Sequence, residues 1–394
     1  MLEVKNLRTE EKNNWVYLKC DIEVTDIENP FEEKSLWIAI EKKNEDMLST
    51  KVYDPFVLVP LMLGMYYGQD VHICGNVSPR LYHNVQHYLI KIFNNFSDFN
   101  KIVDFKVDGF DTVEKGYNTL IGTGISCGVD SMLTLYNNYI KEDDINFKVN
   151  SLFFVNSGTH GDFENPETNT IWLDRANLNK EAADELGLPM YLINSNFHAF
   201  THKIGEQKIG YLAIYSCVLS LQKYIKRYLT SGNLSYDEIA KFSKQSRDFD
   251  IAEYSENYMP HLISTENFEL VIDGCQYTRA EKTEVISDWK FANKHLNVCL
   301  TPINKGRNCS MCEKCMWTLI PLEAMGKLDN FKDVFDKDVY YKASSYYKRK
   351  FLAYENKDAM RTSVINYAKS KEMKLPSKFL SVLEWKIRGI IKKK

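Results

Sequence analysis

The sequence predicts an α/β fold built on a parallel sheet with helices on both faces. From Tyr117 onward, short apolar runs alternate with longer helical patterns, and a loop of small residues separates the first of these strands from its helix. At 394 residues, the chain is long enough for two or three domains with a large core. We expect an N-terminal α+β accessory domain at 1–115, the sheet-based domain at 116–330 and a basic helical tail at 331–394.

The N-terminal region combines patterns of strands and helices. Apolar alternation or short apolar runs predict three strands, at 15–24, 35–40 and 71–77. Longer apolar stripes predict two helices, at 56–67 and 80–96. The histidines of this region are interpreted as packing or surface groups: His72, His83 and His87.

The middle region has the alternation of a parallel sheet. Further strands are predicted at 149–156, 189–194, 228–234 and 268–273, and helices at 171–186 and 209–228. Ligands of open parallel sheets bind beyond the carboxyl ends of the strands. We therefore expect a ligand site to be lined by the segments 126–131, 156–160, 194–196 and 231–233.

The stretch 120–135 reads as a strand, a phosphate-binding loop and the start of a helix. Unpaired backbone N–H groups at a helix start, together with the helix dipole, favour a bound anion. Ser126 and Ser131 add hydroxyl donors, and Asp130 is suited to cap the helix or to hold Mg²⁺ beside a phosphate. We expect Asp130 to lie in a solvent-facing loop.

A second cluster of polar residues begins a predicted helix at Thr278. Arg279 and Lys282 fall in its first turn, where positive charge opposes the helix dipole. Such residues need another reason to be there. Either an anionic phosphate lies close by, or the two side chains are exposed solubilising charges.

Four cysteines form a C-x9-C-x2-C-x2-C pattern: Cys299, Cys309, Cys312 and Cys315. Four thiolates this close in sequence fit a tetrahedral Zn²⁺ site of the structural type. An iron–sulfur cluster is the alternative, because x2 spacings also occur in ferredoxin-like runs. A set of free thiols is the third interpretation, although it would be prone to oxidation.

Composition predicts a cytoplasmic protein with reduced thiols. The charged N-terminus has no apolar segment typical of a secretory signal, and no apolar run is long enough to span a membrane. Charge is distributed unevenly. Residues 337–394 contain 16 lysines and arginines against 5 acidic residues, so they carry +11, whereas the remaining residues carry −14. Such a tail either binds an anionic partner or packs on the acidic body.

The chain has neither a Walker loop nor a Rossmann Gly-x-Gly-x-x-Gly motif. Instead, the hexapeptide 126–131 resembles the Ser-Gly-Gly-x-Asp-Ser loop of the PP-loop ATP pyrophosphatases, which have the adenine nucleotide alpha-hydrolase-like fold. The order of this loop, the 278–282 helix start and the four cysteines resembles 7-cyano-7-deazaguanine synthase and its relatives. The resemblance covers about 117–326 and leaves out the N-terminal region and the tail, as in longer relatives from polysaccharide, natural-product and anti-phage gene clusters.

The resemblance implies an enzyme that uses ATP, Mg²⁺ and Zn²⁺. The expected catalytic residues are Asp130, Lys282 and Arg279. The expected nucleotide-binding residues are Ser126, Cys127, Gly128, Val129, Asp130, Ser131, Asn156 and His160. The zinc ligands would be Cys299, Cys309, Cys312 and Cys315. Two departures from the family pattern are Cys127 in place of a loop glycine and a slightly longer cysteine spacing.

The predicted function is that of an ATP-dependent ligase or synthase. It would split ATP into AMP and pyrophosphate and activate a carboxylate or carbonyl oxygen, on a small molecule or a protein, for attack by a nitrogen nucleophile. One alternative is a thiolating enzyme acting on RNA or a small molecule, with Cys127 as the persulfide carrier. Another is a non-catalytic nucleotide-binding subunit of a larger assembly. Partners considered are a protein or nucleic acid on the basic tail, and a second copy of the chain.

Overall fold

One mixed sheet of ten strands runs through much of the chain. The computed structural model describes residues 1–95, 100–113, 118–158, 160, 162–204, 206–242, 257–299 and 307–391. The strands are β1 (Leu2–Lys12), β2 (Trp15–Val24), β3 (Ser35–Glu41), β4 (Val71–Val77), β5 (Phe105–Phe110), β6 (Leu120–Gly124), β7 (Ser151–Asn156), β8 (Met190–Ser195), β9 (Ile225–Ser231) and β10 (Glu269–Asp273). Their order is β10-β9-β6-β7-β8-β3-β2-β1-β4-β5. The predicted α/β class is therefore confirmed.

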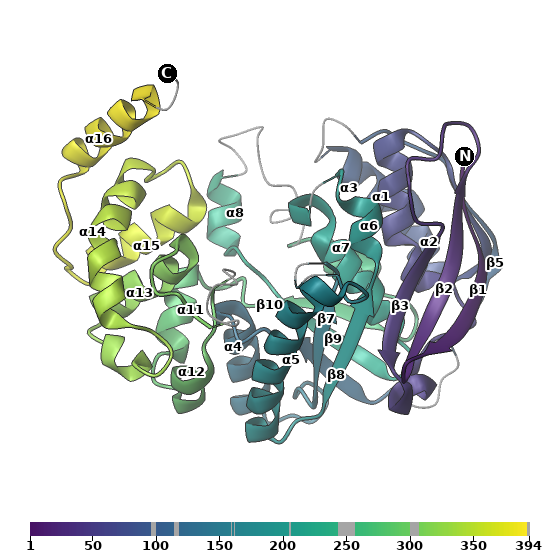
Figure 1. Cartoon of the computed structure of the whole chain (residues 1–394), viewed down its shortest axis with the longest axis horizontal. Helices are drawn as coiled ribbons and strands as arrows, with labels where there is room; N and C mark the ends of the chain where they lie inside the picture. The colour runs from purple at the N-terminus through teal and green to yellow at the C-terminus, as the bar shows by residue number, and fades with distance from the viewer. Residues whose placement is uncertain are drawn as a thin grey trace. The chain divides into compact units, whose positions relative to one another are not determined.

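Strand pairing is mostly parallel, as the alternation of strands and helices predicts. β6 pairs in parallel with both β7 and β9, and β7 pairs in parallel with β8. β1, β2 and β3 form an antiparallel meander, seen in purple in Figure 1, and β4 lies parallel to β1. The meander joins the parallel strands because β3 pairs antiparallel with β8.

The chain forms two compact units. The first contains the described residues of 1–124, 142–230 and 257–272, and the second those of 125–141, 231–242 and 273–391. The first unit holds the sheet and the helices α1 (Leu58–Tyr67), α2 (Pro79–Asn84), α3 (Ile90–Asn95), α5 (Pro166–Leu186), α6 (Phe197–Thr201), α7 (Glu206–Leu219) and α10 (Pro260–Ile263), with shorter helical turns η1 (Lys42–Met47), η2 (Asp54–Phe56) and η3 (Val85–Leu89). The predicted boundary near residue 115 falls inside this unit.

Apolar helices cover the sheet of the first unit. α1 is apolar along nearly its whole length and packs on β1, β4 and α7. A Cβ on its Gly64 would lie 2.2 Å from Val71 Cγ2, so only glycine permits this close approach to β4. The crossovers through α5 and α7 run in opposite directions along the sheet, and right-handed connections therefore place these helices on opposite faces. A single apolar core contains Val4 of β1, Phe153 of β7 and Leu270 of β10.

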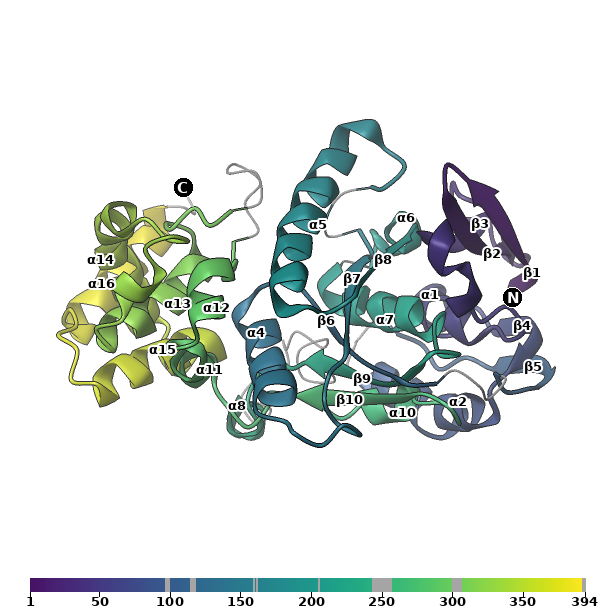
Figure 2. The same cartoon turned by 90° about the horizontal axis from the view of Figure 1, so that it is seen from below.

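The second unit is helical. Its elements are α4 (Val129–Leu135), η4 (Tyr136–Ile140), α8 (Tyr236–Phe242), α11 (Arg279–Ile286), α12 (Lys290–His295), α13 (Glu313–Ala324), η6 (Leu328–Phe331), α14 (Lys337–Ala353), α15 (Ala359–Ser370) and α16 (Lys378–Ile391). α11, α13, α14 and α15 form one packed group, labelled together in Figure 2. α4 packs on α11, which brings the loop 126–131 and the 278–282 segment into one unit.

The predicted basic tail is part of this helical group. Tyr340, Phe351 and Val364 are fully buried, which shows that α14 and α15 contribute to the core. Several tail cations pair with carboxylates of the same unit. Examples are Lys348 with Glu323 at 2.6 Å, Arg361 with Glu313 at 2.7 Å and Lys371 with Glu284 at 2.7 Å. Much of the tail's positive charge is therefore balanced within the unit.

Some element boundaries differ from the predictions. The apolar run 209–228 is not one helix, because α7 ends at Leu219 and a turn leads into β9 at Ile225. The predicted helix 80–96 is a helical run interrupted by the wider turn η3. β1 and β5 were missed. No helix in the described part of the chain combines the length and the apolar character that crossing a membrane requires.

Candidate functional site

The loop after β6 makes a sharp turn at Cys127. This residue has φ of +54°, in the left-handed region, which costs a non-glycine residue about 1–2 kcal/mol. Its side chain is buried, and its carbonyl accepts a hydrogen bond of 2.7 Å from the Asn297 N–H. The position at which the family resemblance expects glycine is thus one whose backbone favours glycine.

Two serines close the loop on itself. Ser126 Oγ lies 3.1 Å from Ser131 Oγ and accepts a hydrogen bond of 3.3 Å from the Gly128 N–H. Ser131 Oγ lies 3.1 Å from the Gly128 carbonyl, to which it donates. The helical hydrogen bonds of α4 begin with the Met132 N–H donating to the Gly128 carbonyl, so the N–H groups of Val129 and Asp130 precede the ladder.

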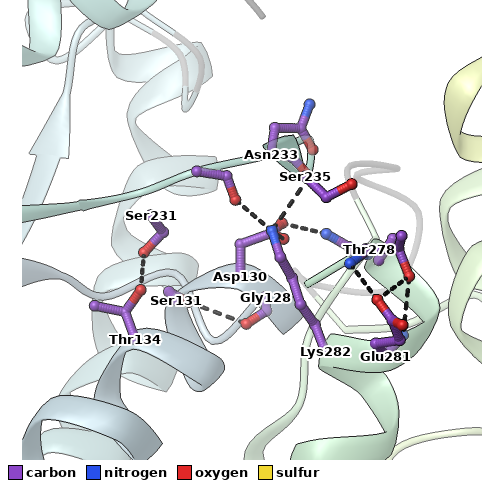
Figure 3. Close-up of polar contacts among 12 residues, drawn as sticks. Gly128, Asp130, Ser131, Thr134, Ser231, Asn233, Ser235, Thr278, Glu281 and Lys282 are labelled. Carbon is purple, nitrogen blue, oxygen red and sulfur yellow. Dashed lines mark hydrogen bonds and ion pairs between the residues drawn. The ribbon is translucent and has the colours of Figure 1, made fainter. Parts of the chain in front are cut away.

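Asp130 lies between two cations. Its Oδ2 accepts a hydrogen bond from Arg279, and its Oδ1 accepts one of 3.0 Å from Lys282 Nζ. Figure 3 shows the side chains of Asp130 and Lys282 pointing toward each other. Asp130 is the second residue of α4 and its side chain is only 21% exposed. The expectation of a solvent-facing loop residue was therefore wrong, because the carboxylate forms a partly buried ion-pair network.

Lys282 is fully buried, and each of its three ammonium hydrogens has a hydrogen-bond acceptor. Besides Asp130 Oδ1, its Nζ donates to the carbonyl oxygens of Gly232 and Asn233, the latter at 3.2 Å. Arg279 is also buried. The interpretation of Arg279 and Lys282 as exposed solubilising charges is therefore wrong. The structure supplies their counter-charge from Asp130 on α4.

The start of α11 fixes both cations. Thr278 and Glu281 form a capping box, in which Glu281 Oε2 accepts hydrogen bonds of 2.7 Å from the Thr278 N–H and 2.8 Å from its hydroxyl (Figure 3). Arg279 and Lys282 are three residues apart, so they project from the same face of the helix. A rigid helix start therefore directs both positive groups at the start of α4.

Charge interactions keep Asp130 ionised. Burial alone would raise the pKa of its carboxyl, but the Arg279 and Lys282 charges outweigh burial and leave the pKa below its ordinary value. With one anion and two cations, the cluster carries a net charge of about +1 at neutral pH. Beside the first N–H groups of α4, this charge makes the site suited to an anion.

The four predicted zinc ligands also come together. Their sulfur atoms all lie within 4.8 Å of one another. Cys299 and Cys312 are 3.7 Å apart, Cys312 and Cys315 3.5 Å, and Cys309 and Cys315 3.9 Å. Tetrahedral zinc with Zn–S bonds of about 2.3 Å requires sulfur separations of about 3.8 Å. The geometry of the four thiols therefore fits one zinc ion.

Local structure supports this cluster on both sides. Asn308 Oδ1 accepts a hydrogen bond of 2.8 Å from the Val298 N–H, so the backbone next to Cys299 is tied to the residue that precedes Cys309. Cys312 is the N-cap of α13, and its N–H donates to Cys309 Sγ at 3.3 Å. Cys315 lies in the first turn of that helix.

Asn156 and His160 belong to the first unit. Asn156 is buried at the end of β7, where its Nδ2 donates to Asn194 Oδ1 at 3.3 Å and its Oδ1 accepts from the Gly158 N–H at 3.1 Å. The His160 ring packs 5.0 Å from that of Phe154, and burial, helped by the Arg175 charge, lowers the pKa of His160 to about 4. The histidine is therefore neutral at pH 7. Their predicted nucleotide contacts remain predictions.

Two acceptors of the site were not predicted individually. The carbonyls of Gly232 and Asn233 hold Lys282, and the hydroxyls of Thr134 and Ser231 lie 2.9 Å apart beside them. Every residue has a carbonyl, so the sequence marks no particular one as a ligand. The sequence did indicate that the segment 231–233 lines a site, because this segment follows a predicted strand.

Comparison with known proteins does not identify the chain. No family model, curated protein or solved structure matches it. The likeness of the loop, the helix start and the cysteines to the PP-loop family therefore remains a prediction from motifs.

Proposed function

We propose that the chain is an ATP-dependent adenylating enzyme of the PP-loop class, similar to 7-cyano-7-deazaguanine synthase. It would attach AMP to a carboxylate or carbonyl oxygen, release pyrophosphate, and allow a nitrogen nucleophile to displace AMP. The observation that carries this proposal is the cluster of Asp130, Arg279 and Lys282 at the start of α4. Three residues expected from motifs more than 140 positions apart meet in one cluster beside the start of a helix.

The backbone of the loop supports the same proposal. Cys127 takes the left-handed conformation that the glycine of a Ser-Gly-Gly-x-Asp-Ser loop adopts without strain. The turn exposes Ser126 and leads directly into the helix start. A loop of this kind binds phosphate oxygens with backbone N–H groups and hydroxyls, which do not depend on the Cys127 side chain.

In the proposed reaction, the cations stabilise the leaving pyrophosphate. A substrate oxygen attacks the α-phosphorus of ATP, the bond to the bridging oxygen of pyrophosphate breaks, and negative charge grows on the leaving group. Arg279 and the first N–H groups of α4 would stabilise that charge as donors, an effect typically worth about 10²–10³ in rate for one donor. Lys282, whose three hydrogens already have acceptors, would contribute through its positive charge. Asp130 acts as a positioning residue because it holds both cations at a fixed place.

Mg²⁺ fits this site less well than the sequence predicts. Both oxygens of Asp130 already accept hydrogen bonds from cations, so a metal there would be a third positive charge on one carboxylate. Mg²⁺ usually binds with one or two carboxylates and the substrate phosphates. We therefore assign no step to a metal on Asp130.

Zinc is proposed as a structural ion on Cys299, Cys309, Cys312 and Cys315. Four protein ligands complete the tetrahedral coordination and leave no position for a substrate. Bound zinc would fix the turn that precedes α13, and α13 packs on α11, the helix that carries Arg279 and Lys282. The cluster would thereby support the site through the packing of the second unit.

Thiolation is less well supported. Its persulfide would have to form on Cys127, but that side chain is only 4% exposed. A sulfur carrier needs access to a donor and to a substrate. Pairing of tail cations with carboxylates elsewhere in the same unit also reduces the charge available for RNA. Non-catalytic nucleotide binding remains the second candidate, because the loop departs from the family pattern at Cys127 and both Asp130 oxygens are engaged.

The decisive test is to identify the products that the chain forms from ATP. The purified chain is incubated with radiolabelled ATP, Mg²⁺ and pools of carboxylates, with and without ammonia, and the products are separated. AMP and pyrophosphate are expected. Lys282→Met should reduce their formation at least 100-fold, whereas the exposed control Lys290→Met should not change it. ADP and phosphate as products, or normal turnover by Lys282→Met, would contradict the proposal, and binding without turnover would favour the non-catalytic alternative.

A further inference from the structure

A second group of metal-binding side chains lies in the first unit, on one face of the sheet. Glu3 lies on β1, and His72 and Cys74 lie on β4. The parallel register places Glu3 opposite His72, and residues two apart on a strand share a face. The carboxylate oxygen, imidazole nitrogen and thiol sulfur all lie within 4.8 Å of one another.

The separation of the ligand atoms suits a transition metal. His72 Nδ1 and Cys74 Sγ are 3.8 Å apart. Tetrahedral zinc, with Zn–N of about 2.0–2.1 Å and Zn–S of about 2.3 Å, places such a pair about 3.6 Å apart. The two side chains therefore need only a small adjustment to bind one ion.

The remaining nitrogen of His72 has the partner that metal-bound histidines usually have. His72 Nε2 lies 2.7 Å from Asp108 Oδ1 on β5. A carboxylate on the far nitrogen fixes the tautomer that presents Nδ1 to a metal and makes that nitrogen more basic. The arrangement thus extends over three neighbouring strands, from β1 through β4 to β5.

We propose that Glu3, His72 and Cys74 bind one divalent transition-metal ion, with zinc as the expected metal. A thiolate and an imidazole favour zinc over calcium or magnesium. Three protein ligands leave one coordination position open, and side-chain exposures of 28% for His72 and 23% for Glu3 allow solvent or a small ligand to reach it. This site is independent of the ATP site and of the four-cysteine cluster.

A lysine beside the three proposed ligands should lower their affinity for a metal ion. Lys5 Nζ lies 3.6 Å from Glu3 Oε2 but only 2.7 Å from Glu23 Oε2, so Glu23 holds this ammonium. The nearby positive charge opposes a bound cation. Lys5→Met should therefore bind zinc more tightly than the wild-type chain.

Zinc stoichiometry tests the proposal. The full chain is dialysed against buffers of fixed free zinc, and bound metal is measured by mass spectrometry. The wild type should bind two equivalents, and Cys74→Ser should retain only the one on the four-cysteine cluster. Glu11→Gln, which alters an exposed carboxylate near the far end of β1, should keep both. Asp108→Asn should keep the fold and weaken the second equivalent by about 10–100-fold.

Alkylation of Cys74 gives a second readout. Zinc should slow its reaction with iodoacetamide at least tenfold, measured by peptide mass mapping, because a coordinated thiolate is not free to react. An equal zinc stoichiometry in the wild type and in Cys74→Ser, or a Cys74 alkylation rate unaffected by zinc, would overturn the assignment. None of these outcomes bears on ATP cleavage.

Discussion

At the residue scale, variants of Cys127 distinguish the adenylating mechanism from the thiolating one. Its left-handed backbone favours glycine, and its thiol is buried. If backbone N–H groups bind the phosphates, Cys127→Gly should keep or raise AMP formation, since the strain of about 1–2 kcal/mol is relieved. Cys127→Ala should remain active too. Loss of turnover in both variants, with ATP binding intact, would instead favour the thiolating enzyme.

Asp54 makes stability depend on pH. Its buried carboxylate accepts hydrogen bonds from the Ser78 N–H at 2.8 Å and from Gln222 Nε2 at 2.7 Å, yet burial raises its pKa from 3.8 to about 6. The folded state therefore holds the proton more tightly than the unfolded state. The free energy of unfolding should fall by about 3 kcal/mol as pH rises from about 3 to about 7.

Asp54→Asn provides the measurement that isolates this effect. The variant cannot ionise, so the difference in free energy of unfolding between it and the wild type should change with pH only across that window. Urea titrations at pH 4, 5, 6 and 7 would show this difference. Parallel pH profiles for the two proteins would mean that Asp54 keeps an ordinary pKa in the folded state.

The sequence identified most residues of the candidate site but not their mutual contacts. Asp130 was expected from its loop, and Arg279 and Lys282 from their unfavourable position at a helix start. That the carboxylate pairs with both cations depends on α4 packing against α11, about 150 positions later in the chain. Local patterns contain no information about such pairing.

At the element scale, the four-cysteine cluster should govern the stability of the second unit. Thiolates bind zinc only when the ligand segments are held together, so binding contributes directly to folding. Cys312→Ser should lose one zinc equivalent and lower the thermal transition. Met311→Ser is the matched control, because Met311 is 56% exposed in the same turn. Iron with visible absorption bands, or a stable chain without metal in this cluster, would contradict the zinc assignment.

Element prediction succeeded where one face of an element is apolar and failed elsewhere. The capping residues Thr278 and Glu281 gave the start of α11 correctly, since their interaction is local. β1 was not predicted because its second half is charged and exposed, and only Leu2 and Val4 are buried. The stretch 209–221 is largely apolar, so periodicity did not reveal that α7 ends at Leu219, and β9 begins only at Ile225.

At the scale of the whole molecule, the sheet connects regions that the sequence separates. The β3–β8 pairing places Ile38 opposite Ser195, and the Trp37 N–H donates to Asn196 Oδ1 at 2.8 Å. Asp54 reaches Gln222 in the same way. Contacts between residues more than 150 positions apart are not visible in local patterns. The change of pattern at Tyr117 therefore predicted a boundary near 115 that falls inside one unit.

The fragment 1–115 should therefore not fold on its own. Without β8, the β3 edge would expose unpaired backbone groups, and without α7 the apolar surface of α1 would face water. We expect the fragment to aggregate or to unfold without a cooperative transition, in urea titrations followed by near-ultraviolet circular dichroism. The full chain is the control, and it should unfold cooperatively. A sharp transition of the fragment with a native-like spectrum would show instead that the N-terminal strands and α1 form an independent domain, whose pairing with β8 is docking between domains.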